Sequence, residues 1–234
     1  MKAGNRGRLY GIGVGPGDPE LLTLKALRLL RAAPVVAYPA PEHGDSFARK
    51  IVAEWLDGRQ HEIAIRFPMR PGPPPAEIYD HAALTVAAEL DGGRDVALLC
   101  QGDPLFYGSF IGLLTRLGDR FSIEIVPGVS SLTACAAAAG MPLATRDESL
   151  SVIPATLAEA DLARRLAAAE IAAIPKLGRH LAKVKRVLEK TGMLAGAICV
   201  ERASLPNQRV LRLAEVDDAP YFSMALVRKT SLER

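Results

Sequence analysis

The sequence contains few cysteines, few aromatic residues and no long apolar run. Its 234 residues include three cysteines, and aromatic residues make up only 5%. Cys100, Cys135 and Cys199 are far apart and each lies in an apolar stretch. We therefore expect them to be small buried hydrophobic residues in a reduced cytoplasm. Scarce aromatic residues beside abundant alanine favour helices packed on a sheet over a β-sandwich.

Signals for membranes, export and metals are also lacking. No segment approaches the roughly 20 unbroken apolar residues of a membrane span. Residues 1–11 include basic residues but no apolar signal core, so we expect a cytoplasmic protein with no membrane partner. Four histidines, at positions 43, 61, 81 and 180, share no ligand spacing with each other or with the cysteines, so no metal site is predicted.

The charge is only mildly basic, with a formal net value of +3. No block of lysine and arginine stands out, and no aromatic residues are interleaved with basic ones, so a nucleic-acid partner is not predicted. A small polyanionic substrate would suit this charge equally well. Charge alone does not decide between these partners.

Strands alternate with helices along the first part of the chain, which is typical of an α/β fold. Asp18 is a plausible N-cap with Pro19 at the first helical position, so a helix is predicted over 19–33. The run 95–100, "DVALLC", is nearly uniformly apolar, as expected for a strand of a parallel sheet that is covered on both faces. Further strands are predicted at 8–14, 34–39, 61–67 and 122–126, and further helices at 46–58, 76–93, 110–118 and 131–140.

A second α/β region is predicted after the segment 141–149, "MPLATRDES", which has the composition of a link. Beyond it a strand at 150–155 and a helix at 157–169 restart the pattern, and Thr156 and Glu159 have the spacing of a capping box. We therefore expect two α/β domains, residues 1–145 and 146–234. The proline-rich stretch 67–80 is expected to be an irregular loop.

Three glycine-containing turns each follow an apolar strand, at 13–18, 102–104 and 127–131. In a parallel sheet such turns emerge at the carboxyl edge, where ligands bind. The first turn contains no G-x-G-x-x-G and no Gly-Lys-Ser/Thr, which argues against a dinucleotide fingerprint and a P-loop. Asp103 either caps a helix or grips a ligand group, and Ser130 and Ser131 are either ligand contacts or N-caps.

Taken together, "GIGVGPGDPELLTLKAL", "QGDPLFYGSF" and "PGVSSLTACAAAAGMPLA" resemble the tetrapyrrole methylases in content and order. That family is a class of S-adenosylmethionine-dependent methyltransferases (class III) with two α/β domains and the cofactor in the cleft between them. The resemblance covers essentially the whole chain. "FPM" at 67–69, "GDPLFYGSF" and "PGVSS" look most like the branch that methylates C-20 of precorrin-2 in cobalamin biosynthesis.

The resemblance implies a set of contact residues, matched motif by motif. The implied cofactor contacts are Pro16, Gln101, Gly102, Asp103, Phe106, Ser130, Ser131, Lys176 and Ala203. The family commonly has methionine where this chain has Pro175, which places the Lys176 contact in doubt. The implied tetrapyrrole carries eight carboxylates, and Arg66, Arg70 and Arg146 would pair with them or remain solvated surface charges. Gly15 and Tyr107 would lie near the ring.

The implied chemistry is methyl transfer to carbon by alignment, without a catalytic nucleophile. Asp103, Glu201 and water stay open as acceptors of the released proton. The resemblance also implies a homodimer. Two alternatives are a methylase of the same class acting elsewhere, on another ring position or a protein as in diphthine synthase, and a non-catalytic tetrapyrrole- or nucleotide-binding module. The sequence does not distinguish a metal-free substrate from its cobalt form.

Overall fold

The computed structural model describes residues 6–68, 72 and 74–229. The chain separates into two compact units, residues 1–130 and 131–234, and each contains one five-stranded sheet. Helix α5 (Ser131–Ala139) packs with the strands of the second unit, whereas the sequence analysis assigned this helix to the first domain.

The sheet of the first unit is entirely parallel, as predicted from its uniformly apolar strand. Its strand order is β3-β2-β4-β1-β5, so β1 is paired on both sides although it comes first in the chain. The strands are β1 (Leu9–Gly13), β2 (Val35–Pro41), β3 (His61–Phe67), β4 (Val96–Cys100) and β5 (Ile123–Val126).

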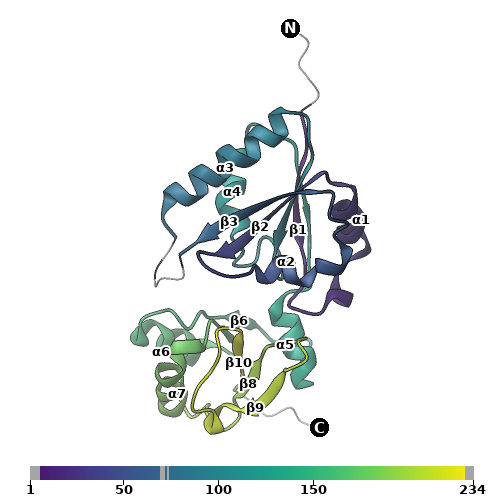
Figure 1. The fold of residues 1–234 in the computed structure, drawn as a ribbon. Coiled ribbons are helices and arrows are strands. Elements are labelled where there is room, and N and C mark those ends of the chain that lie inside the picture. Colours follow the sequence, from purple (N-terminus) through teal and green to yellow (C-terminus); the bar gives the residue numbers. More distant parts are fainter. Residues whose placement is uncertain (1–5, 69–71, 73, 230–234) are drawn as a thin grey trace. The chain divides into compact units, whose positions relative to one another are not determined.

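Two apolar cores cover the two faces of this sheet (Figure 1). Leu98 and Cys100 of β4 face helices α3 (Ala76–Asp91) and α4 (Phe110–Leu117). The alternate residues Ala97 and Leu99 face α1 (Leu24–Ala32) and α2 (Phe47–Ile51). This alternation follows from the two-residue period of a strand and explains why β4 is apolar at every position.

The predicted helix over 19–33 begins later than expected. Asp18 does cap a helical segment, because its Oδ1 accepts a hydrogen bond from the Glu20 N–H at 2.9 Å, but this segment is a 3-10 turn at Pro19–Leu21. Helix α1 starts at Leu24 with Thr23 as its own N-cap. Two cap residues five positions apart therefore divide one predicted helix into two elements.

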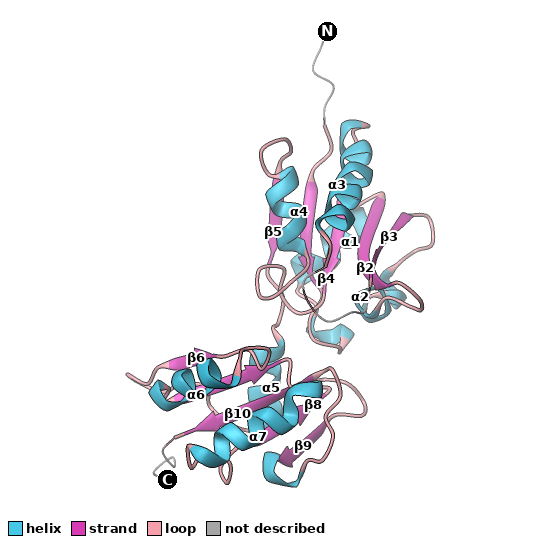
Figure 2. Cartoon of the chain, turned by 90° about the vertical axis from the view of Figure 1, so that its left-hand side faces the viewer, coloured by secondary structure: helices cyan, strands magenta, loops and turns pink. Residues whose placement is uncertain are grey.

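The second unit contains a mixed sheet with the order β6-β7-β10-β8-β9. Strands β6 and β7 are parallel, and β10 runs antiparallel to both β7 and β8. Figure 2 shows α6 (Glu159–Ala168) and α7 (Leu181–Lys190) over one face, while α5 contacts β8 and β10. The strands are β6 (Leu150–Val152), β7 (Ile171–Pro175), β8 (Ile198–Glu201), β9 (Arg209–Arg212) and β10 (Ser223–Arg228).

The capping box predicted at Thr156 and Glu159 is wrong. Helix α6 begins at Glu159 itself, after Ala158, and no side chain caps it. The Glu159 carboxylate instead pairs with Arg186 and Lys190 of α7 at 3.0 and 3.3 Å. Shorter 3-10 turns lie at Ala53–Trp55, Gly178–His180 and Leu213–Glu215.

Candidate functional site

Three loops meet at the carboxyl edge of the first sheet, as the sequence analysis expected. They follow β1, β4 and β5, which are adjacent strands running in the same direction. Gly15 and Gly102 form an antiparallel backbone pair across the first two loops. The Gly102 N–H donates to the Gly15 carbonyl at 2.8 Å, and the Gly15 N–H donates to the Gly102 carbonyl at 3.3 Å.

The glycines of these loops are required by contacts between the loops themselves. A Cβ on Gly13 would lie 2.5 Å from the Gly128 nitrogen, and a Cβ on Gly128 would lie 2.2 Å from the Gly102 carbonyl oxygen. Both contacts are with backbone, which has little room to shift. Gly15 and Gly102 also adopt φ values of +79° and +67°, which glycine accepts without steric cost. The dense glycines of the first loop thus approach the backbones of the second and third loops.

Asp103 uses both carboxylate oxygens on backbone donors. Its Oδ1 accepts from the Leu105 N–H at 2.9 Å within the second loop, and its Oδ2 accepts from the Gly128 N–H at 3.0 Å in the third loop. No helix begins at Pro104, because α4 starts at Phe110, so the carboxylate closes a turn and does not cap a helix as one reading of the sequence expected. The bond to Gly128, which is far away in the sequence, was not predicted.

The second loop also carries an aromatic pair. The rings of Phe106 and Tyr107 pack edge to face with their centroids 4.9 Å apart. Tyr107 is 48% exposed and has a φ of +57°, a left-handed conformation that is uncommon for an aromatic residue. Tyr107 therefore presents the flat face of its ring in one of the three loops at the carboxyl edge of the sheet.

The remaining candidates of the first unit differ in how they are held. Pro16 is buried, and Gln101 and Ser130 are half-buried. Arg66, at the same edge, donates from Nη1 to the Pro41 carbonyl at 3.0 Å and is largely exposed. Arg70 lies outside the described residues.

The second unit brings Lys176 and Ala203 to one edge of its sheet. Lys176 follows the end of β7 and Ala203 follows the end of β8, and both strands are antiparallel to β10 between them. The Arg202 N–H donates to the Phe222 carbonyl at 2.7 Å, which ties the turn after β8 to the start of β10. Pro175 ends β7, and its carbonyl accepts from the Ala155 N–H at 3.0 Å.

Left-handed backbone is concentrated in these loops. Within the described ranges, the non-glycine residues with positive φ are Tyr107, Arg146, Lys176, Arg202 and Ser204. Three of them are predicted site residues, and the other two flank Ala203. Because such conformations persist only where surrounding structure imposes them, and often at ligand sites, they support the predicted positions independently of the motifs.

The sequence model of the family described as Tetrapyrrole (Corrin/Porphyrin) Methylases matches residues 8–217. The chain belongs to this family. The family and the α/β fold class predicted from the sequence are therefore confirmed.

The chain covers individual relatives to different extents. It is 46% identical, over 95% of its length, to the cobalamin biosynthesis protein CobIJ of Mycobacterium bovis, and spans about half (46%) of that longer relative. It is 44% identical to a precorrin-2 C(20)-methyltransferase of a Sinorhizobium species, over 94% of this chain and 95% of the relative. A solved uroporphyrin-III C-methyl transferase of Thermus thermophilus, complexed with S-adenyl homocysteine, matches with a TM-score of 0.72 and 28% identity, over 95% of this chain and 92% of that chain.

Glu201 is a buried carboxylate at the end of β8, with 1% of its surface exposed. Arg202 and Arg209 lie 3.6 and 3.5 Å from its Oε2. These residues line a cavity of about 650 Å³, which is also lined by Glu215, Asp217 and Asp218.

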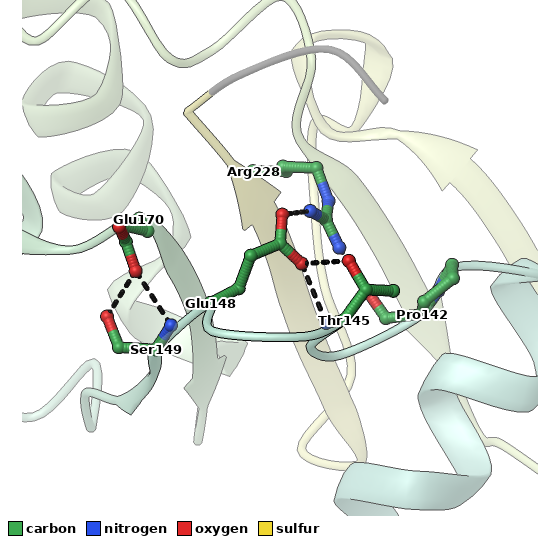
Figure 3. A network of polar contacts seen from close by, with 6 residues as sticks. All are labelled: Pro142, Thr145, Glu148, Ser149, Glu170 and Arg228. Atoms are coloured by element: carbon green, nitrogen blue, oxygen red, sulfur yellow. Dashed lines mark hydrogen bonds and ion pairs between the residues drawn. The ribbon is translucent and has the colours of Figure 1, made fainter. Parts of the chain in front are cut away.

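Arg146 lies at the other edge of the second sheet from Lys176 and Ala203. It precedes β6, at the edge where β6 and β7 begin and β10 ends. Figure 3 shows how its loop is held: Arg228 of β10 pairs with Glu148 and donates to the Pro142 carbonyl at 3.0 Å. Glu148 in turn accepts from the N–H and hydroxyl of Thr145, at 2.7 and 2.6 Å. The structure therefore does not group Arg146 with the other candidates of its unit.

Sequence reasoning missed several residues that organise the site. Gly128 was part of a quoted motif, but its N–H bond to Asp103 had no local signal. Arg202 and Ser204 could have been found only through their position beside Ala203 in "ERAS". In the described part of the chain, no cluster of three or more His, Cys, Asp or Glu is arranged to hold a metal. No helix there is long and apolar enough to cross a membrane.

Proposed function

We propose that this protein transfers the methyl group of S-adenosylmethionine to C-20 of precorrin-2 or of its cobalt form. The observation that carries the proposal is the 44% identity to a relative of this activity, which extends over nearly the whole of both chains. The motifs "FPM", "GDPLFYGSF" and "PGVSS" support the same ring position. The product is precorrin-3A or its cobalt counterpart.

The described residues fit a ligand that is recognised largely through backbone groups. The interlocked glycines leave backbone rather than side chains at the sheet edge, and Lys176 has the left-handed conformation often found at ligand sites. S-Adenosylmethionine supplies an electrophilic methyl group on a good leaving group. The residues proposed to hold it are Pro16, Gln101, Gly102, Phe106, Ser130, Ser131, Lys176 and Ala203, whereas Asp103 is proposed to position the loops that carry several of them.

The substrate is proposed to seat its ring on apolar surface and its carboxylates on arginines. Tyr107 offers an exposed ring in the loop after β4, and Arg66 has a guanidinium at the same sheet edge. A bidentate guanidinium matches a carboxylate in shape and charge. Arg70 and Arg146 remain candidates on the family resemblance alone.

Catalysis is proposed to depend on alignment and exclusion of water rather than on a protein nucleophile. Holding two reactants in line supplies several kcal/mol of the barrier. The meso carbon releases a proton after methylation. Both Asp103 oxygens already accept backbone N–H groups, and Glu201 is buried beside two arginines. We therefore favour water as the proton acceptor.

The test is incubation with precorrin-2 and carbon-13 methyl-labelled S-adenosylmethionine, followed by NMR of the product. Label at the C-20 meso bridge is expected. Label at a ring carbon that bears an acetate would contradict the assignment of position while leaving the methylase activity intact. No transfer to metal-free or cobalt-containing substrate, despite cofactor binding, would favour the non-catalytic module. Comparing turnover of the two substrates also decides which form is used.

We further propose a cytoplasmic homodimer, which rests on the family resemblance alone. Light scattering at micromolar concentration would give twice the chain mass of 25.0 kDa. We expect calorimetry to detect S-adenosylhomocysteine binding and no NADH binding.

A further inference from the structure

We propose that the Asp103 carboxylate is a positioning group that fixes the third loop against the second, and acts on the methyl donor only through Gly128. The inference rests on the proposed function for its consequence, but the contact itself lies within the first unit. It assigns Asp103 a role different from both a cofactor ligand and a proton acceptor.

The two oxygens of the Asp103 carboxylate accept hydrogen bonds from two different loops. Oδ1 accepts from Leu105 in its own loop at 2.9 Å, and Oδ2 accepts from Gly128 in the neighbouring loop at 3.0 Å. A carboxylate has two acceptor oxygens and an amide has one, so asparagine at this position keeps only one of these bonds. Hydrogen bonds to an ionised acceptor are also stronger than neutral ones.

The bond completes a chain of contacts across the three loops. Gly15 and Gly102 join the first loop to the second, and Asp103 joins the second to the third. Gly128 precedes Ser130 and Ser131, the proposed contacts of the third loop, by two and three residues. A Cβ on Gly128 would overlap the Gly102 carbonyl, so the third loop packs directly against the second. In such close packing, one hydrogen bond is enough to fix the position of the third loop.

The first experiment measures the contact without any ligand. Amide hydrogen exchange of Gly128, followed by NMR in the full chain, should be about tenfold faster or more in Asp103→Asn, because its acceptor is lost or weakened. Thr23→Ala is the control, since Thr23 caps α1 locally through the Ala26 N–H at 3.1 Å. It should lower the melting temperature and leave Gly128 exchange unchanged. Asp103→Ala removes both acceptor oxygens, and unchanged exchange in both Asp103→Asn and Asp103→Ala would overturn the proposal.

The second experiment separates positioning from direct contact. Binding of S-adenosylhomocysteine, its 2′-deoxy form and 5′-methylthioadenosine, which lacks the amino-acid part, is measured by calorimetry. A positioning role predicts about a tenfold rise in Kd for all three ligands in Asp103→Asn, and none in Thr23→Ala. If Asp103→Asn weakens binding of the complete ligand but not of a ligand that lacks one group, Asp103 contacts that group directly. This result would overturn the proposal. If Gly128 exchanges faster in Asp103→Asn but the wild-type protein binds none of these ligands, the contact stands and the proposed function is refuted.

Discussion

Tyr107, Lys176, Arg202 and Ser204 each hold a backbone conformation that costs an L-amino acid about 1–2 kcal/mol. Glycine would remove this cost at any of the four positions, yet none is glycine. A side chain at these points therefore carries a benefit that offsets the strain, such as the ring of Tyr107 beside the second loop. At the residue scale, strain marks the candidate site more directly than charge does.

The cysteines allow a residue-scale prediction. Burial raises the pKa of both Cys135 and Cys199 to about 12, and also raises the pKa of Cys100. Because the thiolate is the reactive form, Ellman's reagent at pH 8 should label the native protein about a thousandfold more slowly than the unfolded chain. The measurement is absorbance with and without guanidinium chloride. Rapid labelling of one native thiol would contradict the buried assignment for that residue.

At the scale of elements, the strand-end loops behave as one assembly. Gly13, Gly102 and Gly128 come from three loops, and each occupies space that a side chain on a neighbour would need. Loops of this kind must fold together, because none has its final shape without the backbone of the next. Their fixed geometry would pre-organise a ligand site and lower the entropy lost on binding.

Gly128→Ala should therefore destabilise the protein by about 1–3 kcal/mol or more, because its new methyl group overlaps backbone atoms. It should also weaken S-adenosylhomocysteine binding. Gly196→Ala is the matched control, since no atom lies within 4 Å of its added Cβ. We expect that variant to stay within about 0.5 kcal/mol of the wild type in urea unfolding. Equal stability of the two variants would contradict the interlocked loops.

Local patterns predicted the elements better than their ends or their contacts. The apolar run before Gln101 predicted a buried parallel strand because that environment acts on every residue of the run. The capping box at Thr156 failed because Glu159 had distant partners on α7 that no local pattern reveals. For the same reason the motif analysis located Asp103 in the site but not its bond to Gly128.

At the scale of the whole molecule, paired carboxylates set the response to acid. The pKa of Glu62 is lowered by hydrogen bonds from Arg49, whose Nε and Nη2 lie 2.6 and 2.8 Å from its two oxygens. The pKa of Glu148 is lowered by Thr145 and then Arg228, and that of Glu170 by Ser149. These carboxyls bind protons less readily in the folded state than in the unfolded chain.

Stability from these groups is therefore fully present above the ordinary glutamate pKa of 4.5 and is lost as the pH falls through the lower folded-state values. The melting temperature should be nearly constant from about pH 6 to 8 and should fall by several degrees below about pH 4.5. Glu62→Gln should lower the plateau and reduce the acid-dependent drop. Thermal unfolding followed by circular dichroism measures the melting temperature at neutral pH and its decrease in acid. A decrease of unchanged size in Glu62→Gln would exclude Glu62 as a contributor.

The position of β1 has a consequence for synthesis on the ribosome. Leu9–Gly13 pairs with Val96–Cys100 on one side and with Ile123–Val126 on the other, so both partners emerge long after it. At roughly 5–20 residues per second, about 4 to 18 seconds pass before the first partner of β1 has been made, and both edges of β1 are unpaired until then. Throughout that interval the nascent chain exposes an apolar strand ending in the first glycine loop. The loop that shapes the site is thus the first to be translated and among the last to acquire its structure.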